Sequence, residues 1–214
     1  MHPRAPVGIV IRGTGVVALC LWTAAARGGQ PELGGPVARE AIAICQEADQ
    51  LPAAERAAVL ALGLTRAEEA VKADPQDAAA HLALFCNLGK GLMNRSGWSL
   101  FGVLGDLGRA RKEIDAALAL APDYPGALAA KGEMLVQLPR LFGGDPAEGA
   151  RLLQSAVALN PDDPKMRLML AKVLDAIGQR DAARQQASIA LGILERAGPA
   201  NELATARIFV ANVQ

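Results

Sequence analysis

Aromatic residues are scarce in this chain of 214 residues: Phe, Trp and Tyr together make up 3% of it. Alanine, leucine and glycine dominate instead, so we expect helices that pack closely through small side chains. A chain of this length can bury a substantial core, as one domain or as one short repeat array. No segment alternates apolar and polar residues as a half-buried strand does. The sequence therefore predicts an all-α protein.

The chain also lacks an excess of charge of either sign. Lys plus Arg and Asp plus Glu both number 22, which gives a formal net charge of zero, and no long basic block is visible. Nucleic acid is therefore a poor candidate partner, because contact with its phosphates needs a cationic face.

The motifs of common catalytic and metal sites are missing as well. Gly-x-Ser-x-Gly, His-Glu-x-x-His and the phosphate-loop glycine pattern do not occur. Two histidines and three cysteines without a close cysteine pair offer no zinc site. An enzyme would need titratable side chains around His81, which is more simply a half-buried helix residue. We therefore expect a non-catalytic protein with no cofactor and no metal.

Residues 1–26 have the features of a signal peptide. Arg4 and Arg12 give a positive start, and residues 15–22 form an apolar core that is too short to span a bilayer comfortably. Residues 24–26 are three alanines, the small-x-small pattern that a signal peptidase reads, so cleavage is predicted after Ala26. This interpretation makes the protein exported, periplasmic or extracellular.

Two alternatives keep a membrane contact open. The N-terminal segment could remain uncleaved as an anchor. Alternatively, a lipid could be attached to Cys20, although Leu19 precedes this cysteine where lipid attachment requires a small residue. Residues 27–36 are rich in glycine and proline and are expected to form a flexible tether. The packed domain is then expected over residues 37–214.

Three predicted helices are each followed by a proline, and each carries residues suited to close packing at the same distances before that proline. A small residue, an apolar residue and an alanine stand 12, 8 and 5 residues before a proline. The sets are Gly63, Ala67 and Ala70 before Pro75, Ala110, Ile114 and Ala117 before Pro122, and Gly149, Leu153 and Ala156 before Pro161. Such a recurrence is typical of a helical repeat.

The pattern resembles the tetratricopeptide repeat, a helix–turn–helix unit of 34 residues. The best copy covers residues 163–195, where Leu170, Ala171, Leu174, Gly178, Ala183, Ala187 and Ala190 take the packing positions of that family. The resemblance implies a right-handed superhelix of four repeats, over residues 37–75, 77–122, 125–161 and 163–196, with a capping helix over residues 201–213. It further implies a scaffold that binds a protein or peptide on its concave face.

Two interruptions separate these repeats, at residues 95–108 and 139–144. The first could be a loop over the groove or a glycine-rich start to the next helix. Both contain Leu-Phe-Gly, which is similar to exported bacterial tetratricopeptide proteins, including those like the T component of TRAP transporters. This weaker similarity implies a transporter accessory with an apolar pocket near Trp98, Phe101 and Phe142. The alternative is that these aromatics fill gaps between alanine-rich helices.

The first helix of each repeat supplies the candidate binding residues of the concave face. Positions 11 and 15 residues beyond the preceding proline are Cys86 and Lys90, Glu133 and Gln137, and Lys172 and Ala176. The lining is mildly polar, and its lysines are too scattered for a cluster that would clamp a terminal carboxylate. A solvated inner surface without a ligand is the alternative.

Two cysteines, Cys45 and Cys86, would survive cleavage of the signal peptide. An exported protein with two cysteines invites a disulfide. Buried free thiols on apolar helix faces are nevertheless commoner, because cysteine behaves as a small hydrophobe. We expect free thiols and keep the disulfide as the alternative. Asp145, Asp162 and Asp163 stand at predicted helix starts, as caps and not as paired catalytic acids, and Glu148 would complete a capping box with Asp145.

Overall fold

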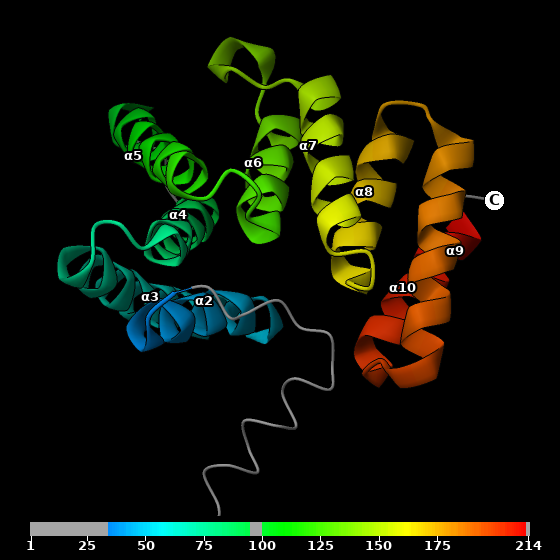
Figure 1. Ribbon diagram of the computed structural model, residues 1–214, viewed down its shortest axis with the longest axis horizontal. Helices are drawn as coiled ribbons and strands as arrows, with labels where there is room; N and C mark the ends of the chain where they lie inside the picture. The colour runs from blue at the N-terminus through cyan, green and yellow to red at the C-terminus, as the bar shows by residue number, and fades with distance from the viewer. Residues whose placement is uncertain (1–33, 95–99, 213–214) are drawn as a thin grey trace, which may run out of the picture. The chain divides into compact units, whose positions relative to one another are not determined.

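The computed structural model describes residues 34–94 and 100–212 (Figure 1). The predicted signal peptide and Trp98 lie outside these residues. The described part of the chain contains nine α-helices, two short 3-10 helices and no strand, which confirms the all-α prediction. The elements are α2 (Pro36–Glu47), η1 (Ala48–Gln50), α3 (Ala53–Ala73), α4 (Ala78–Met93), α5 (Leu100–Leu120), α6 (Pro125–Gln137), η2 (Arg140–Phe142), α7 (Pro146–Leu159), α8 (Pro164–Ala176), α9 (Arg180–Ala197) and α10 (Ala200–Asn212).

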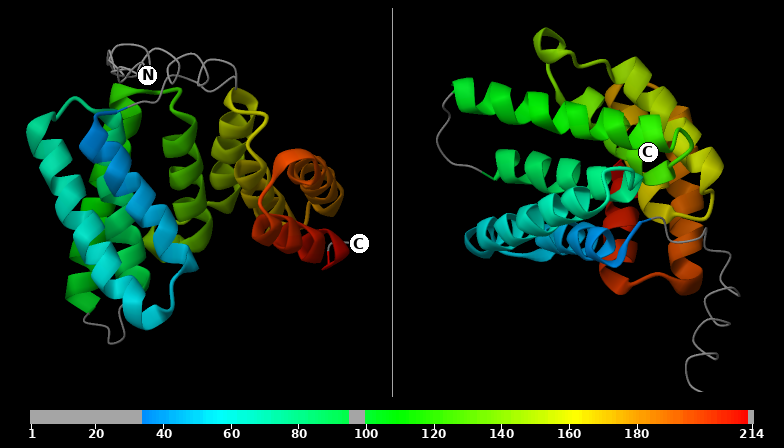
Figure 2. Two further views of the ribbon diagram at one scale, coloured as in Figure 1. Left: turned by 90° about the horizontal axis from the view of Figure 1, so that it is seen from below. Right: turned by 60° about the vertical axis from the view of Figure 1, so that its left-hand side comes forward.

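The helices pack as consecutive pairs, α2 with α3, α4 with α5, α6 with α7, and α8 with α9, and α10 lies against α9 (Figures 1 and 2). Neighbouring pairs meet mainly through α3 and α4 and through α7 and α8. The first helices of the pairs also touch one another in sequence, α2 with α4, α4 with α6, and α6 with α8. We call the side formed by α2, α4, α6 and α8 the inner face.

Small residues let these helices approach closely. The repeat positions before Pro75, Pro122 and Pro161 are buried, and Ile114, Leu153 and Ala156 have no exposed surface. Between α6 and α7 the backbones themselves meet at Gly132 and Gly149. A β-carbon on Gly132 would lie 2.8 Å from the Gly149 carbonyl oxygen, so neither position can carry a side chain without the helices moving apart.

Aspartates begin several helices, as the sequence predicts, although Asp162 lies in the turn before the cap of α8. The side chain of Asp77 accepts a hydrogen bond from the amide of Ala79, and Asp145 and Asp163 cap α7 and α8 in the same way. The predicted capping box at α7 is wrong in its second half. The Asp145 amide donates to the Leu135 carbonyl at 2.9 Å, and the carboxylate of Glu148 pairs with Arg151 instead.

The two interruptions have different structures. Helix α5 already begins at Leu100 and runs through three glycines, so the second alternative, a glycine-rich helix start, holds for the described residues. Between α6 and α7 the chain forms η2 and then turns at Gly143, whose φ of +75° suits a residue without a β-carbon. Arg111 of α5 donates to the Phe142 carbonyl and so fastens this turn to the preceding pair.

The packed region begins before Val37, because the last residues of the predicted tether are already held. The Gly35 amide donates to Asp77 Oδ2 at 2.8 Å, and Arg39 donates to the Gly34 carbonyl at 2.7 Å. Helix α2 then starts at Pro36, a residue well suited to a first helical turn. None of the helices described is long and apolar enough to cross a membrane.

Candidate functional site

The first and second repeats are joined on the inner face by a covalent bond. Cys45 of α2 and Cys86 of α4 form a disulfide, with their Cα atoms 6.2 Å apart. The expectation of two free thiols is therefore wrong: the helices approach so closely at these small residues that the sulfur atoms meet. Cys86 is thus part of the framework and is not a ligand-binding thiol.

Lys90, one turn beyond Cys86 on α4, is also engaged within the protein. Its ammonium donates to the Cys45 carbonyl at 2.9 Å and to Asp49 Oδ2 at 2.6 Å. The end of α2 leaves backbone carbonyls without intrahelical partners, and Lys90 satisfies one of them. Lys90 therefore supports the junction of α2, η1 and α4, and its charge is largely compensated before any ligand arrives.

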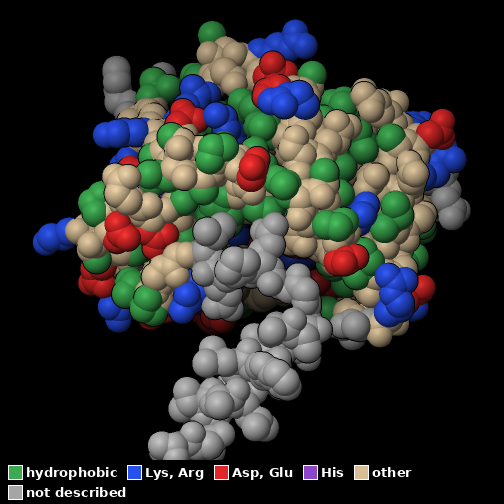
Figure 3. All heavy atoms as spheres, in the orientation of Figure 1, with side chains coloured by type: hydrophobic (Ala, Val, Ile, Leu, Met, Phe, Trp, Pro, Cys, Tyr) green, Lys and Arg blue, Asp and Glu red, His purple; other side chains and the backbone are tan. Residues whose placement is uncertain are grey.

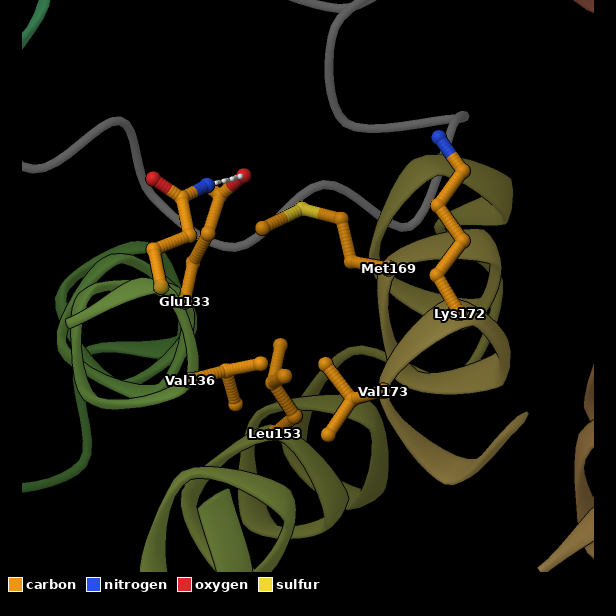
Figure 4. Close-up of a pocket in the computed structure, with 7 residues that line it drawn as sticks. Glu133, Val136, Leu153, Met169, Lys172 and Val173 are labelled. Atoms are coloured by element: carbon orange, nitrogen blue, oxygen red, sulfur yellow. Dashed lines mark hydrogen bonds between the residues drawn. The ribbon is translucent and has the colours of Figure 1, made fainter. Parts of the chain in front are cut away.

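Of the four remaining predicted inner-face residues, all but Ala176 line a pocket between α6 and α8. Its volume is about 220 Å³, and it is lined by Glu133, Val136, Gln137, Leu153, Met169, Lys172 and Val173 (Figure 4). Val136, Leu153 and Val173 form an apolar floor, to which α7 contributes Leu153. Three of the seven lining residues are those that the repeat spacing predicted: Glu133, Gln137 and Lys172.

The polar side chains stand at opposite sides of the pocket. Glu133 extends from α6 and Lys172 from α8, and the thioether of Met169 reaches between them (Figure 4). Glu133 Oε1 accepts a hydrogen bond from Gln137 Nε2 at 3.0 Å, which fixes the carboxylate along α6. The mouth of the pocket is thus anionic on the α6 side and cationic on the α8 side.

The carboxylate of Glu133 occupies an unfavourable position for a charge. Its surface is partly exposed, yet the protein around the inner face displaces bulk water and raises the pKa of Glu133 above its ordinary value. Lys90 opposes this increase, Asp49 adds to it, and Lys172 opposes it again. Charges from α4, η1 and α8 thus all act on one carboxylate of α6.

Lys172 differs from Lys90 in having its ammonium available. The side chain is exposed, and within the described residues it forms no ion pair or hydrogen bond. It acts on Glu133 only through its charge. Lys172 is therefore the inner-face cation that a ligand can reach.

Of the three aromatic residues predicted to form an apolar patch, the structure describes the side chain of Phe142, which does not line this pocket. Trp98 and the side chain of Phe101 lie outside the described part of the chain. Phe142 is half-buried at the end of η2, whereas its neighbour Leu141 is 87% exposed. The structure therefore places the pocket away from Phe142, in the groove between two first helices.

His81 has a structural position. Its Nδ1 lies 2.7 Å from Glu113 Oε2 of α5, and its Nε2 lies 3.0 Å from the Pro75 carbonyl oxygen. The ring is half-buried and ties α4 both to α5 and to the turn before α4. Among the described residues, no group of three or more His, Cys, Asp and Glu side chains could hold a metal ion.

Sequence reasoning missed Val136, Met169 and Val173, which make the pocket apolar. Each lies within three residues of a predicted inner-face position, on the adjacent stripe of its helix. Their apolar character was visible in the sequence, but it was compatible with ordinary core packing. The repeat spacing could not predict the gap between α6 and α8 into which these three side chains point.

Comparison with known proteins agrees with the repeat pattern. Residues 143–199, from the turn after η2 to the end of α9, match the family model of the tetratricopeptide repeat. This segment is similar to a tetratricopeptide repeat. The helix pairs before it follow the same succession, so the described chain is the predicted superhelix of tetratricopeptide-like pairs with a C-terminal helix.

Solved structures with a similar fold include a tetratricopeptide-repeat protein and MamA. The tetratricopeptide-repeat protein TTC0263 of Thermus thermophilus is 22% identical, with 81% of this chain and 98% of that chain covered and a TM-score of 0.44. MamA of Desulfovibrio magneticus RS-1, residues 41 to the end, is 18% identical, with 84% and 94% covered and a TM-score of 0.46. No curated protein matches the chain. Neither structure is named as a TRAP transporter component, so that similarity stays a prediction.

Proposed function

We propose that this chain is a non-catalytic scaffold that binds a protein or peptide partner through its inner face. The observation that supports this function is the pocket between α6 and α8, where an apolar floor is flanked by Glu133 and Lys172. Protein interfaces combine an apolar centre with a polar rim in this way. By analogy, the similarity to the tetratricopeptide repeat supports this function, because this fold binds protein partners in many proteins.

The size of the pocket favours a protein partner over a carried small molecule. Sites that enclose a small ligand have volumes of about 300–1,000 Å³. The volume here is about 220 Å³, and three polar side chains border it. The pocket volume therefore supports a scaffold that binds a protein segment better than it supports a transporter accessory that encloses an apolar ligand.

The charge distribution argues against a nucleic-acid partner. On the face seen in Figure 3, positive and negative side chains are interspersed among hydrophobic ones. The whole chain has no net charge. A surface of this kind gives phosphates no cationic track to follow.

We further propose that the protein is exported. The arginines, apolar core and alanines of residues 1–26 support a signal peptide, as argued from the sequence. The disulfide between Cys45 and Cys86 is consistent with this location, because such bonds persist in oxidising compartments.

Site-specific photo-crosslinking in the native cells tests the scaffold function. A photoreactive residue is placed at the inner-face positions Gln137 or Ala176, and, as matched controls, at Lys112 of α5 or Arg184 of α9, all of which are exposed. The proposal predicts a discrete protein adduct from the inner positions only. Adducts that form equally well, or only, from the outer helices would contradict binding through the inner face.

A further inference from the structure

The pocket between α6 and α8 has room for one side chain. Its volume of about 220 Å³ is below that of small-molecule sites, which begin at about 300 Å³. Its floor is made of branched aliphatic side chains at Val136, Leu153 and Val173. A partner therefore gains most by burying one large apolar side chain here.

Met169 determines which apolar side chain suits the mouth of the pocket. It is half-buried, and its thioether stands between the Glu133 and Lys172 sides (Figure 4). Methionine is unbranched and adapts its shape to a neighbour, so flexible aliphatic partners such as Leu or Met pack well against it. A polar side chain would leave its hydrogen-bonding groups unsatisfied on the aliphatic floor.

The two sides of the mouth treat charge differently. On the α6 side the Glu133 carboxylate, held by Gln137, repels an acidic group. On the α8 side the exposed ammonium of Lys172 attracts one, and within the described residues no acidic partner pairs with it. Lys90 does not compete for the ligand, because it is already paired with Asp49.

We propose that this pocket binds a Leu or Met side chain of a partner protein, and that an acidic residue of the same segment pairs with Lys172. The proposal rests on the proposed function and specifies the partner chemistry for it. The segment carries its acidic residue on the α8 side of the anchor. The partner motif is thus a Leu or Met that packs against Met169, next to an acidic residue that pairs with Lys172.

Selection of peptides tests the charge preference directly. The full chain is immobilised and exposed to a phage-displayed library of random peptides, in parallel with its Lys172→Glu variant. A third selection uses Lys112→Glu, which makes the same charge change at an exposed position of α5. Thermal unfolding of each variant confirms that it is folded.

The proposal predicts that wild-type protein and Lys172→Glu enrich peptides with the same Leu or Met anchor. The residue beside the anchor should be Asp or Glu for the wild type and Lys or Arg for Lys172→Glu. Lys112→Glu should keep the acidic preference. An acidic preference that survives Lys172→Glu, a consensus without an apolar anchor, or no enrichment at all would overturn the proposal.

The anchor itself is tested with one enriched peptide, synthesised with both termini blocked so that no terminal charge contributes. Met169→Glu is expected to weaken its binding at least about tenfold in fluorescence anisotropy, because a charge then meets the apolar anchor. Unchanged affinity would overturn the assignment of the pocket. If photo-crosslinks form on the inner face while the peptide motif fails, the proposed function stands and only this inference falls.

Discussion

The side chain of Asn87 occupies the space over Gly63. Asn87 is 1% exposed, and its Nδ2 donates to the Ala41 carbonyl of α2 at 3.0 Å and to the Ala83 carbonyl of α4 at 2.9 Å. Its Oδ1 has no hydrogen-bond partner in the described part of the chain and lies against α3 at Gly63. One amide thus joins three helices, and it fits only because position 63 lacks a β-carbon.

The Gly63→Ala substitution should therefore destabilise the protein, although alanine is the better helix former by about 1 kcal/mol. A β-carbon there would collide with Asn87 Oδ1 and lie 2.8 Å from Asn87 Cγ. We expect a loss of about 2 kcal/mol in the free energy of unfolding, measured by urea denaturation. Gly108→Ala is the matched control: it lies on a helix with open space around it and should be neutral or stabilising.

The coupling between the two residues can be measured separately. Asn87→Ala alone should cost about 2–3 kcal/mol, because it removes two buried hydrogen bonds and leaves a cavity. Combined with Gly63→Ala, the loss should be smaller than the sum of the two, since the added methyl group then has room. Strict additivity would show that the two side chains do not compete for the same space.

Removal of the disulfide should destabilise the first repeats. Cys45 and Cys86 are 41 positions apart, and a bond that closes a loop of this length stabilises a fold by about 3–4 kcal/mol in the chain-entropy model. We expect a loss of this size for Cys45→Ala/Cys86→Ala, and for the wild type with a reducing agent. Equal midpoints of urea unfolding with and without reductant would contradict the bond, as would free thiols at Cys45 and Cys86 in the protein unfolded without reductant.

The sequence predicted the helices well and the contacts between them less well. Ala53–Ala73 and its Asp74-Pro75 stop follow from local periodicity and proline chemistry, so the helix bounds could be predicted. Spacing from Pro122 and Pro161 also brought Glu133 and Lys172 to the same face. Local spacing cannot give the separation between α6 and α8 that turns this face into a pocket, because that separation depends on how α7 packs below them.

The disulfide shows the same limit. Cys45 and Cys86 lie on apolar stripes, and both a buried thiol and a bonded pair satisfy that pattern. The deciding quantity is the approach of α2 to α4, which the small residues around Asn87 and Gly63 allow. Leu141 is the opposite case: it is an apolar residue that lies exposed within η2, next to the Phe142 carbonyl that accepts a hydrogen bond from Arg111.

The raised pKa of Glu133 predicts a pH dependence of stability. The folded protein binds a proton at Glu133 at a higher pH than the unfolded chain does, so at neutral pH the ionised carboxylate lowers stability. As the pH falls through the folded pKa towards the ordinary glutamate range, this cost disappears. Glu133→Gln keeps an acceptor for Gln137 and should be more stable than the wild type at neutral pH.

The measurement is urea denaturation of both proteins at several pH values. The advantage of Glu133→Gln should shrink as the pH falls, because the wild type becomes protonated at this site. The charges that act on Glu133 are Lys90, Asp49 and Lys172, so these residues must be unchanged in both proteins. A difference that is independent of pH would mean that the carboxylate is not desolvated on the inner face.

The contributions of Asp145 and Glu148 to stability can be measured separately, although the sequence predicted these two residues as one capping box at the start of α7. Asp145 accepts hydrogen bonds from the amides of Ala147 and Glu148 at 3.1 Å, so Asp145→Ala should cost about 1 kcal/mol. Among the described residues, the Glu148 carboxylate makes only an exposed ion pair with Arg151 one turn on, so Glu148→Ala should cost about 0.2–0.5 kcal/mol. Salt distinguishes the two effects: 1 M NaCl should abolish the smaller loss, since it screens the ion pair, and leave most of the larger one. Equal losses for both variants would restore the reciprocal capping box, with Glu148 satisfying the Asp145 amide that the structure assigns to the Leu135 carbonyl.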